Sequence, residues 1–198
     1  MRKLRSESRD ASANQMAERA HQFREMREAH ELTIVLPRIT SGNRDYLPVG
    51  LVGANTVVSS QSFALFDEPL WVLSFLSSRL HLAWIATVCG RTRTDFAYSN
   101  TLGWNTFPVP TLTEKNKADL TACAEAILLA REAHFPATIA DLYDPEKMPE
   151  NLRAAHDRND ETIERIYSGR RFKNDTERLE KLFEMYTKMT SKKAKVTV

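Results

Sequence analysis

The sequence predicts an α+β fold, in which a small mixed β-sheet with packed helices precedes an all-α helical domain. Strand-like runs rich in β-branched and aromatic residues occur only in the first 110 residues. Pro108 and Pro110 then interrupt the chain, and every later segment has apolar residues at helical spacing. We therefore expect two domains, over residues 1–110 and 111–198.

The first 31 residues are polar and charged, with only sparse apolar positions. They predict a short helix around residues 14–29 that is either loosely packed or docked on something outside this chain. Strand patterns follow over residues 32–36, 46–52 and 56–59, and "TSGNRD" predicts a turn at residues 40–45.

A helix is predicted after Asp67-Glu68-Pro69, since acidic residues and proline favour the first helical turn. Its apolar stripe consists of Leu73, Leu76, Leu80, Trp84 and Val88, and it ends at Gly90. Serine, arginine and histidine interrupt this stretch, which indicates a buried amphipathic helix and not a membrane span.

The second half reads as a series of helices. Thr111 or Thr113 is expected to cap a helix that reaches about His134, and a short helix and turn follow in "ATIADLYDPEKMP". Further helices are expected over residues 150–167 and after Asp175, with apolar residues on one face of each.

Charge is unevenly distributed along the chain. The total is 28 basic against 26 acidic residues, but residues 111–164 hold 6 basic and 12 acidic side chains, and residues 165–198 hold 10 basic and 4 acidic ones. The basic end could lie along phosphate, or it could be a solvated helical face with a frayed tail. Two isolated cysteines and the lack of a signal peptide fit a reducing cytoplasm.

The residues for catalysis are missing. The six glycines form no nucleotide-binding loop, and the five histidines have no metal-ligand spacing. His81 and His156 are expected to be hydrogen-bonded structural residues. We therefore expect no catalytic residue, no metal site and no bound cofactor in this chain.

The stretch "GRTRTDFAYS" predicts a strand over residues 91–98. Alternation would place Arg91, Arg93, Asp95 and Ala97 on one face and Thr92, Thr94, Phe96 and Tyr98 on the other. The second face, continued by Trp104 and Phe107, can pack on the preceding helix. The first can read DNA, because arginine pairs with guanine and aspartate accepts from cytosine. The alternative is an edge strand whose charges prevent aggregation.

Several motifs resemble a known family. "SRLHLAW", "CGRTRTDFAYS" and "WNTFPVP" occur in the order found near the end of MmeI-like (type IIL) restriction–modification enzymes and their solitary DNA methyltransferase relatives. "ELTIVLPRITSGNRDYLPVGLV" upstream and "LYDPEKMPENLRAAHDRND" downstream extend the likeness over residues 32–186. Any single motif is weak, whereas their joint order is specific.

The resemblance implies recognition of double-stranded DNA by an adenine-specific methyltransferase. The family's base readers precede "YS", and by match they are Arg93, Asp95 and Ala97 here. Weaker candidates for contacts with DNA backbone or bases are Arg38, Arg44, Arg79, Arg91, Arg170 and Arg171. The chain departs from the family pattern at Thr92, Ala97, Trp104 and Val109. Ala97 in place of a common arginine suggests one base contact fewer, or a different target.

The adenine-methylating motif N/D-P-P-Y/F and a methyl-donor glycine motif are both missing. The resemblance therefore implies that S-adenosylmethionine binds a catalytic domain or subunit outside this chain, and that Met1 lies inside or just before the recognition domain. There are two rival interpretations. One is a helical protein-interaction module with no DNA-binding role, and the other is an independent enzyme.

Overall fold

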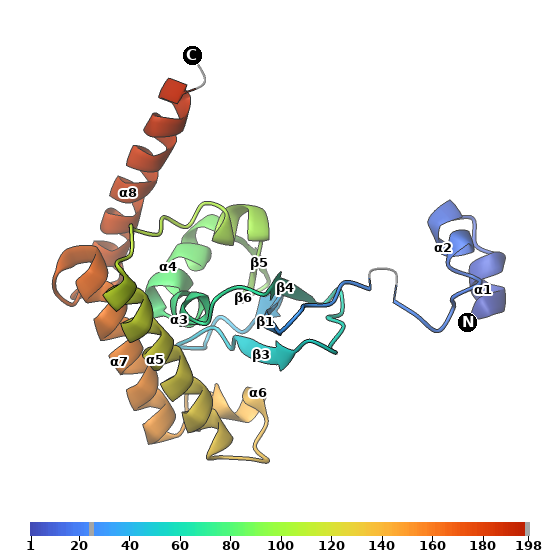
Figure 1. Cartoon of the computed structure of the whole chain (residues 1–198), viewed down its shortest axis with the longest axis horizontal. Helices are drawn as coiled ribbons and strands as arrows, with labels where there is room; N and C mark the ends of the chain where they lie inside the picture. The colour runs from blue at the N-terminus through green and yellow to red at the C-terminus, as the bar shows by residue number, and fades with distance from the viewer. Residues whose placement is uncertain (24–25, 197–198) are drawn as a thin grey trace.

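The structure is a computed structural model that describes residues 1–23 and 26–196, and the side chains of 192–196 lie outside that description. Two three-stranded antiparallel sheets lie beside a set of packed helices (Figure 1). The predicted α+β class is confirmed, and the part of the chain after Pro110 is helical in its described residues.

The first sheet has β1 (Leu32–Pro37) at its centre, between β3 (Gly50–Gly53) and β4 (Ser62–Phe66). Thr33 lies opposite Val52 on one side and Phe66 on the other. Alternation turns Ile34 and Leu36 into the core, where each is 1% exposed.

The chain passes from the first sheet to the second at Arg38. Its backbone N–H donates to Gln61 O (3.1 Å), and its carbonyl accepts from the N–H of Tyr98 (2.8 Å). The second sheet has the order β2 (Ile39–Thr40), β6 (Asp95–Ala97), β5 (Gly90–Thr92). One residue therefore couples both sheets.

Two strand predictions need correction. The strand expected over residues 46–52 begins only at Gly50, because Tyr46, Leu47, Pro48 and Val49 are all buried and do not alternate. The strand expected over residues 56–59 is wrong. "SFALF" forms β4 instead, where Phe63 and Leu65 pack on the core and the alternate residues face away from it. The strand at 32–36 is confirmed. The turn expected over residues 40–45 begins only after Thr40, which is paired with Phe96 in β2.

The helix expected over residues 14–29 is also wrong within its described residues. The N-terminal segment holds two short helices, α1 (Arg2–Ser6) and α2 (Ala11–Gln15), which lie apart from the main body (Figure 1). Residues 24–25, within the predicted helix, lie outside the described residues. Isolated helices of this length are marginal, and the sparse apolar positions offer little face to bury.

The helix predicted to follow Asp67 is broken in two, α3 (Trp71–Leu76) and α4 (Arg79–Val88). Ser78 takes an extended conformation between them and caps α4 by accepting from the N–H of His81. Asp67 lies outside both helices, at φ 56°, and its carboxylate accepts from the N–H groups of His30 and Glu31. A serine pair therefore ends one helix and starts the next.

The helical second half follows its sequence signals closely. α5 (Glu114–Glu132) begins with a reciprocal capping box between Thr113 and Asn116. α6 (Ile139–Leu142), α7 (Glu150–Ser168) and α8 (Asp175–Val196) follow. Gly169, at φ 76°, ends α7 in the left-handed conformation that glycine adopts without cost. The cap of α8 is Asn174, which accepts from Glu177, and not Asp175.

Three hydrophobic clusters form the core, and each joins residues from both sides of Pro110. The first includes Ala124 of α5 together with Ile34 and Leu36 of β1. The second includes Leu120 and Ile163 with Phe75 and Trp84, and the third includes Ile127 with Tyr46. The two predicted domains therefore share their cores.

Three polar residues of α7 are buried where this helix packs against the N-terminal half of the chain. His156, Asn159 and Asp160 share one helix face because they are spaced by three and four residues. We refer to them as the α7 polar row. His156 Nδ1 lies 3.2 Å from Ser77 O, and the Asn159 side chain donates to Ser74 O (2.9 Å). The Asp160 carboxylate accepts from the N–H of Arg79 (2.8 Å) and from Tyr46 Oη (3.1 Å).

Burial raises the pKa of Asp160 to about 7, and it lowers the pKa values of His81 and His156 to about 3. Between pH 6.5 and pH 4 the unfolded chain binds two protons at the histidines, whereas the folded chain binds one at Asp160. Unfolding therefore takes up one net proton at these three groups, and their contribution to stability should fall on acidification.

The Asp160→Asn variant lacks the proton that the folded chain binds at Asp160, so only the two histidines remain of the three groups. Denaturant unfolding at pH 6.0, 5.5 and 5.0 should then show a steeper loss of stability on acidification in the variant than in the wild type, by about 1 kcal/mol per pH unit. Equal slopes in the two proteins would contradict the buried, proton-binding state of Asp160.

Candidate nucleic-acid interface

The "GRTRTDFAYS" stretch is a β-hairpin and not the single strand expected over residues 91–98. β5 and β6 pair in the register Arg91 opposite Phe96 and Thr92 opposite Asp95, which leaves a two-residue turn of Arg93 and Thr94. Arg93 has φ 59°, and Thr94 has no positive φ. This is the φ pattern of a type II′ turn, in which glycine normally takes the first position.

The hairpin changes which side chains lie together. Residues directly opposite share a face, so Thr92, Asp95 and Ala97 lie on one side and Arg91 lies with Phe96 on the other. The prediction that Asp95 and Ala97 share a face is therefore confirmed. The prediction that Arg91 and Arg93 lie on that same face is wrong. Ile39, opposite Ala97 on β2 and 52% exposed, extends the same face.

Arg93 is at the tip of the hairpin. Its side chain is exposed and has no hydrogen bond or ion pair within the described part of the chain. Asp95 and Ala97 are half-buried beside it. A two-pronged donor, a carboxylate acceptor and a small apolar group thus occupy one short stretch.

The aromatic residues below the hairpin pack as expected. Phe96, Tyr98 and Phe107 are each 5–6% exposed. Tyr98 Oη lies 3.1 Å from His81 Nε2, and the His81 ring meets the Phe107 ring edge-on at 4.7 Å. The prediction that His81 is a hydrogen-bonded core residue is confirmed, as is that for His156, which contacts Tyr143 and Ser77.

Three of the weaker candidates border the hairpin or the turn before it. Arg44 donates to Thr40 Oγ1 (3.1 Å), and Arg79 pairs with Asp45 (3.1 Å). Arg38 donates to Ser60 O and lies over the Phe63 ring. Each of these guanidinium groups thus has a partner in the folded chain.

Arg170 and Arg171 lie in the connection between α7 and α8 and are paired within the protein. Arg170 contacts Glu177 at 2.9 Å, and Arg171 contacts both carboxylate oxygens of Asp157, at 2.6 and 3.1 Å. The hydrogen bond from Arg171 lowers the pKa of Asp157. A phosphate would have to compete with these carboxylates.

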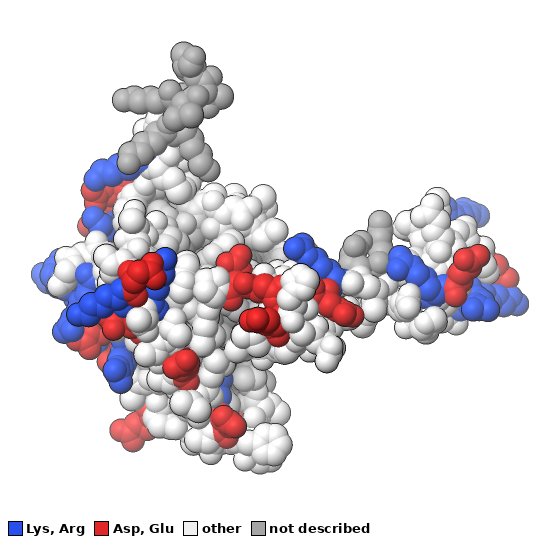
Figure 2. Space-filling model, in the orientation of Figure 1, with Lys and Arg blue, Asp and Glu red and all other residues white. Residues whose placement is uncertain are grey.

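The charges form no continuous basic band on the face drawn in Figure 2. Basic side chains gather over α1 and α2 at one end and over α5, α7 and α8 at the other, and mainly acidic side chains lie between them. This face does not define a DNA-binding surface. The lysines of residues 192–195, part of the basic end noted in the sequence, lie outside the described side chains.

The turn at residues 41–44 was recognised as a turn, but its contact with the hairpin was missed. A Cβ on Gly42 would lie 2.3 Å from Thr94 O, so the two backbones are in direct contact. The glycine in "TSGNR" was the available signal, since glycine permits close backbone approach. Its partner, 52 residues later, could not be read from spacing.

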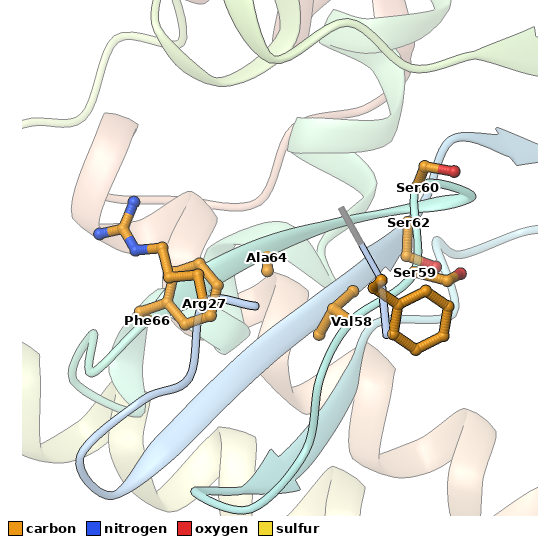
Figure 3. Close-up of a pocket in the computed structure, with 8 residues that line it drawn as sticks. Arg27, Val58, Ser59, Ser60, Ser62, Ala64 and Phe66 are labelled. Carbon is orange, nitrogen blue, oxygen red and sulfur yellow. The ribbon is translucent and has the colours of Figure 1, made fainter. Parts of the chain in front are cut away.

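A pocket of about 540 Å³ opens on the side of the first sheet that faces away from the core. Ser62, Ala64 and Phe66 of β4 form one wall, and Arg27 and Val58 come from neighbouring segments (Figure 3). Its described lining residues include no acid or histidine. Among the described residues no group of three or more His, Cys, Asp or Glu could hold a metal ion, and no helix is long and apolar enough to cross a membrane.

Comparisons with known proteins agree with this architecture. The family profile "MmeI, target recognition domain" matches residues 1–111, and "MmeI, C-terminal domain" matches residues 112–194. DNA methyltransferase A of Bacillus subtilis (strain 168) is 38% identical over 188 residues, which are 95% of this chain and 21% of that protein.

A solved structure shows the same arrangement. The type IIL restriction–modification enzyme MmeI, in complex with DNA, superposes with a TM-score of 0.87 at 30% identity, over 96% of this chain and 25% of that chain. The chain thus spans a fifth to a quarter of the length of these relatives. It belongs to the MmeI family, as that family's target recognition domain followed by its C-terminal domain.

Proposed function

We propose that this chain selects the DNA sequence at which an adenine-specific DNA methyltransferase acts. The observation that carries the proposal is the β5–β6 hairpin, whose tip presents Arg93 without a partner in the described chain, on a fold that matches an enzyme solved with DNA. The major groove of B-DNA admits a two-stranded β-ribbon, so the hairpin has a suitable size.

Each residue of the exposed face has a chemical role in this proposal. Arg93 donates two hydrogen bonds to O6 and N7 of a guanine, and Asp95 accepts from N4 of a cytosine. Ala97 and Ile39 offer apolar contact to a thymine methyl group. Arg38, Arg44 and Arg79 would reach phosphates by giving up their present partners in the protein. Arg170 and Arg171, at the α7–α8 connection, would do the same.

The chemistry itself would come from elsewhere. We propose that S-adenosylmethionine and the catalytic residues belong to the part of the longer enzyme that this chain does not span, and that methyl transfer needs both parts. Whether that enzyme also cuts DNA is a separate property. The Bacillus relative supports a bacterial cytoplasmic location, beside the chromosome.

The rival interpretation, a helical adaptor without DNA binding, has less support. It gives no role to the free arginine at a strained hairpin tip. Salt separates the two, since DNA binding weakens steeply as salt rises because phosphate contacts release counterions. An adaptor would bind no duplex at any salt concentration.

Recognition by this chain can be transferred to a relative. Replacing the matching segment of the Bacillus DNA methyltransferase A with these 198 residues should yield an enzyme that methylates a new set of sites, because the specificity travels with the hairpin. Sequencing of methylated adenines in host DNA measures this. Methylation at the relative's own sites, or a folded chimera that neither methylates nor binds duplex DNA, would contradict the proposal.

Within that chimera, Arg93→Ala should make one position of the site degenerate. Loss of a two-pronged base contact costs about 1–3 kcal/mol of discrimination, and an exposed residue contributes little to stability, within about 0.5 kcal/mol. Phe96→Ala is the matched contrast, because removing this buried ring should cost about 3–5 kcal/mol of stability. An active Arg93→Ala enzyme with unchanged stringency would exclude base reading by Arg93.

A third expectation concerns the chain by itself. Without the remainder of the enzyme it should bind duplex DNA only in the non-specific range, about 10⁻⁴ to 10⁻⁶ M, with a steep salt dependence. Titration of labelled duplexes at several salt concentrations tests this, and site-specific nanomolar binding by the isolated chain would contradict it.

A further inference from the structure

We propose that Gly42 and Arg91 are positioning residues, which hold the hairpin tip in the one conformation that aims Arg93 at a base. The inference rests on the proposed function and goes beyond it, because neither residue touches DNA in this account. It follows from three observations at the tip: a backbone contact, a hydrogen bond and a strained dihedral angle.

The backbone contact involves Gly42. Its Cα lies so near the hairpin that an added Cβ would be 2.3 Å from Thr94 O and 3.4 Å from Thr94 C. Real Cβ atoms essentially never come within 3 Å of such atoms, and backbone cannot swing away as a flexible side chain can. The turn at residues 41–44 is itself held, by the Arg44 N–H bond to Ser41 O (3.3 Å) and by Arg44 Nη1 to Thr40 Oγ1.

The hydrogen bond is made to the same Thr94 carbonyl, by a side chain of the hairpin itself. Arg91 Nη1 donates to Thr94 O (3.2 Å), and the guanidinium lies 4.5 Å from the centre of the Phe96 ring. Phe96 is 6% exposed and pairs with Thr40 of β2. Arg91 therefore ties the turn to a buried ring, and its charge is engaged in the hairpin.

The strained angle is that of Arg93, at φ 59°. A non-glycine residue in this region is held there by its surroundings, and such outliers gather at functional sites. Glycine would adopt the same turn without strain. The fold thus keeps a strained arginine at the tip and holds the next residue, Thr94, by two contacts, one from Gly42 and one from Arg91.

Gly42→Ala tests the backbone contact, with Gly53→Ala as its matched control. Both replace a glycine by alanine, but Gly53 lies on β3 of the other sheet, and a Cβ there meets no heavy atom within 4 Å. In the chimeric methyltransferase, we expect Gly42→Ala to relax discrimination at the Arg93-dependent position by about fivefold to 150-fold. Gly53→Ala should keep the wild-type stringency.

A second readout needs no DNA. In the 198-residue chain, Gly42→Ala should speed amide hydrogen exchange in residues 92–95, since the tip loses its support, while exchange in α5 and α7 stays unchanged. Unchanged hairpin exchange together with unchanged stringency would overturn the inference.

Arg91→Ala tests the second support and adds no atom, so it serves even where Gly42→Ala fails to fold. If Arg91 acts through Thr94, stringency falls and the slope of log affinity against log salt stays the same. If Arg91 instead contacts a phosphate, the slope becomes shallower by about one unit and stringency is retained, which overturns the inference. Failure of the wild-type chimera to adopt a new site would overturn the proposed function as well, whereas retained stringency in both variants overturns the inference alone.

Discussion

The buried contact between α7 and the N-terminal half is the constraint on which the rest of the structure depends. The α7 polar row takes its partners from Ser74, Ser77, Arg79 and Tyr46. Buried polar groups without partners are costly, so this set of contacts permits few relative positions of the helices. The break between α3 and α4 is part of that fit, because it presents Ser77 O and the N–H of Arg79 to α7.

This contact also determines where the hairpin lies. Asp160 and Asn159 hold the start of α4 and the end of α3, and α4 carries His81 and Trp84, which pack under Tyr98 and Phe107. Above this buried layer, the exposed face of the hairpin consists of a few side chains with small roles in the core. Such a division lets the recognised sequence change by surface substitution while the core is retained.

The sequence predicts best where local signals decide the structure. Helices α5 and α7 follow from a capping box, a terminal glycine and a regular apolar stripe, and β1 follows from a compact β-branched run. Prediction failed where distant contacts decide. Residues 46–49 are β-like in composition, yet Tyr46 and Val49 serve as partners for helices far along the chain. Ser77 and Ser78 look like polar positions in one continuous helix.

The hairpin shows the same limit at the candidate site. The alternation of residue types in "RTRTDFAYS" is compatible with one continuous strand and also with two strands joined by a two-residue turn. No Asn-Gly or Asp-Gly pair marks a turn in this stretch. Asp95 and Ala97 were therefore placed together correctly, whereas Arg91 was assigned to the wrong face. Gly42 was read only as a turn residue, because its contact with Thr94 exists only in the folded chain.

The most direct test is a structure of the complete enzyme, or of the chimera that carries this chain, bound to a duplex with its methylation site. The account predicts the β5–β6 hairpin in the major groove, with the Arg93 guanidinium within hydrogen-bond distance of a base edge and Arg91 still bonded to Thr94 O. A hairpin that faces solvent, with the bases read from another part of this chain, would contradict it.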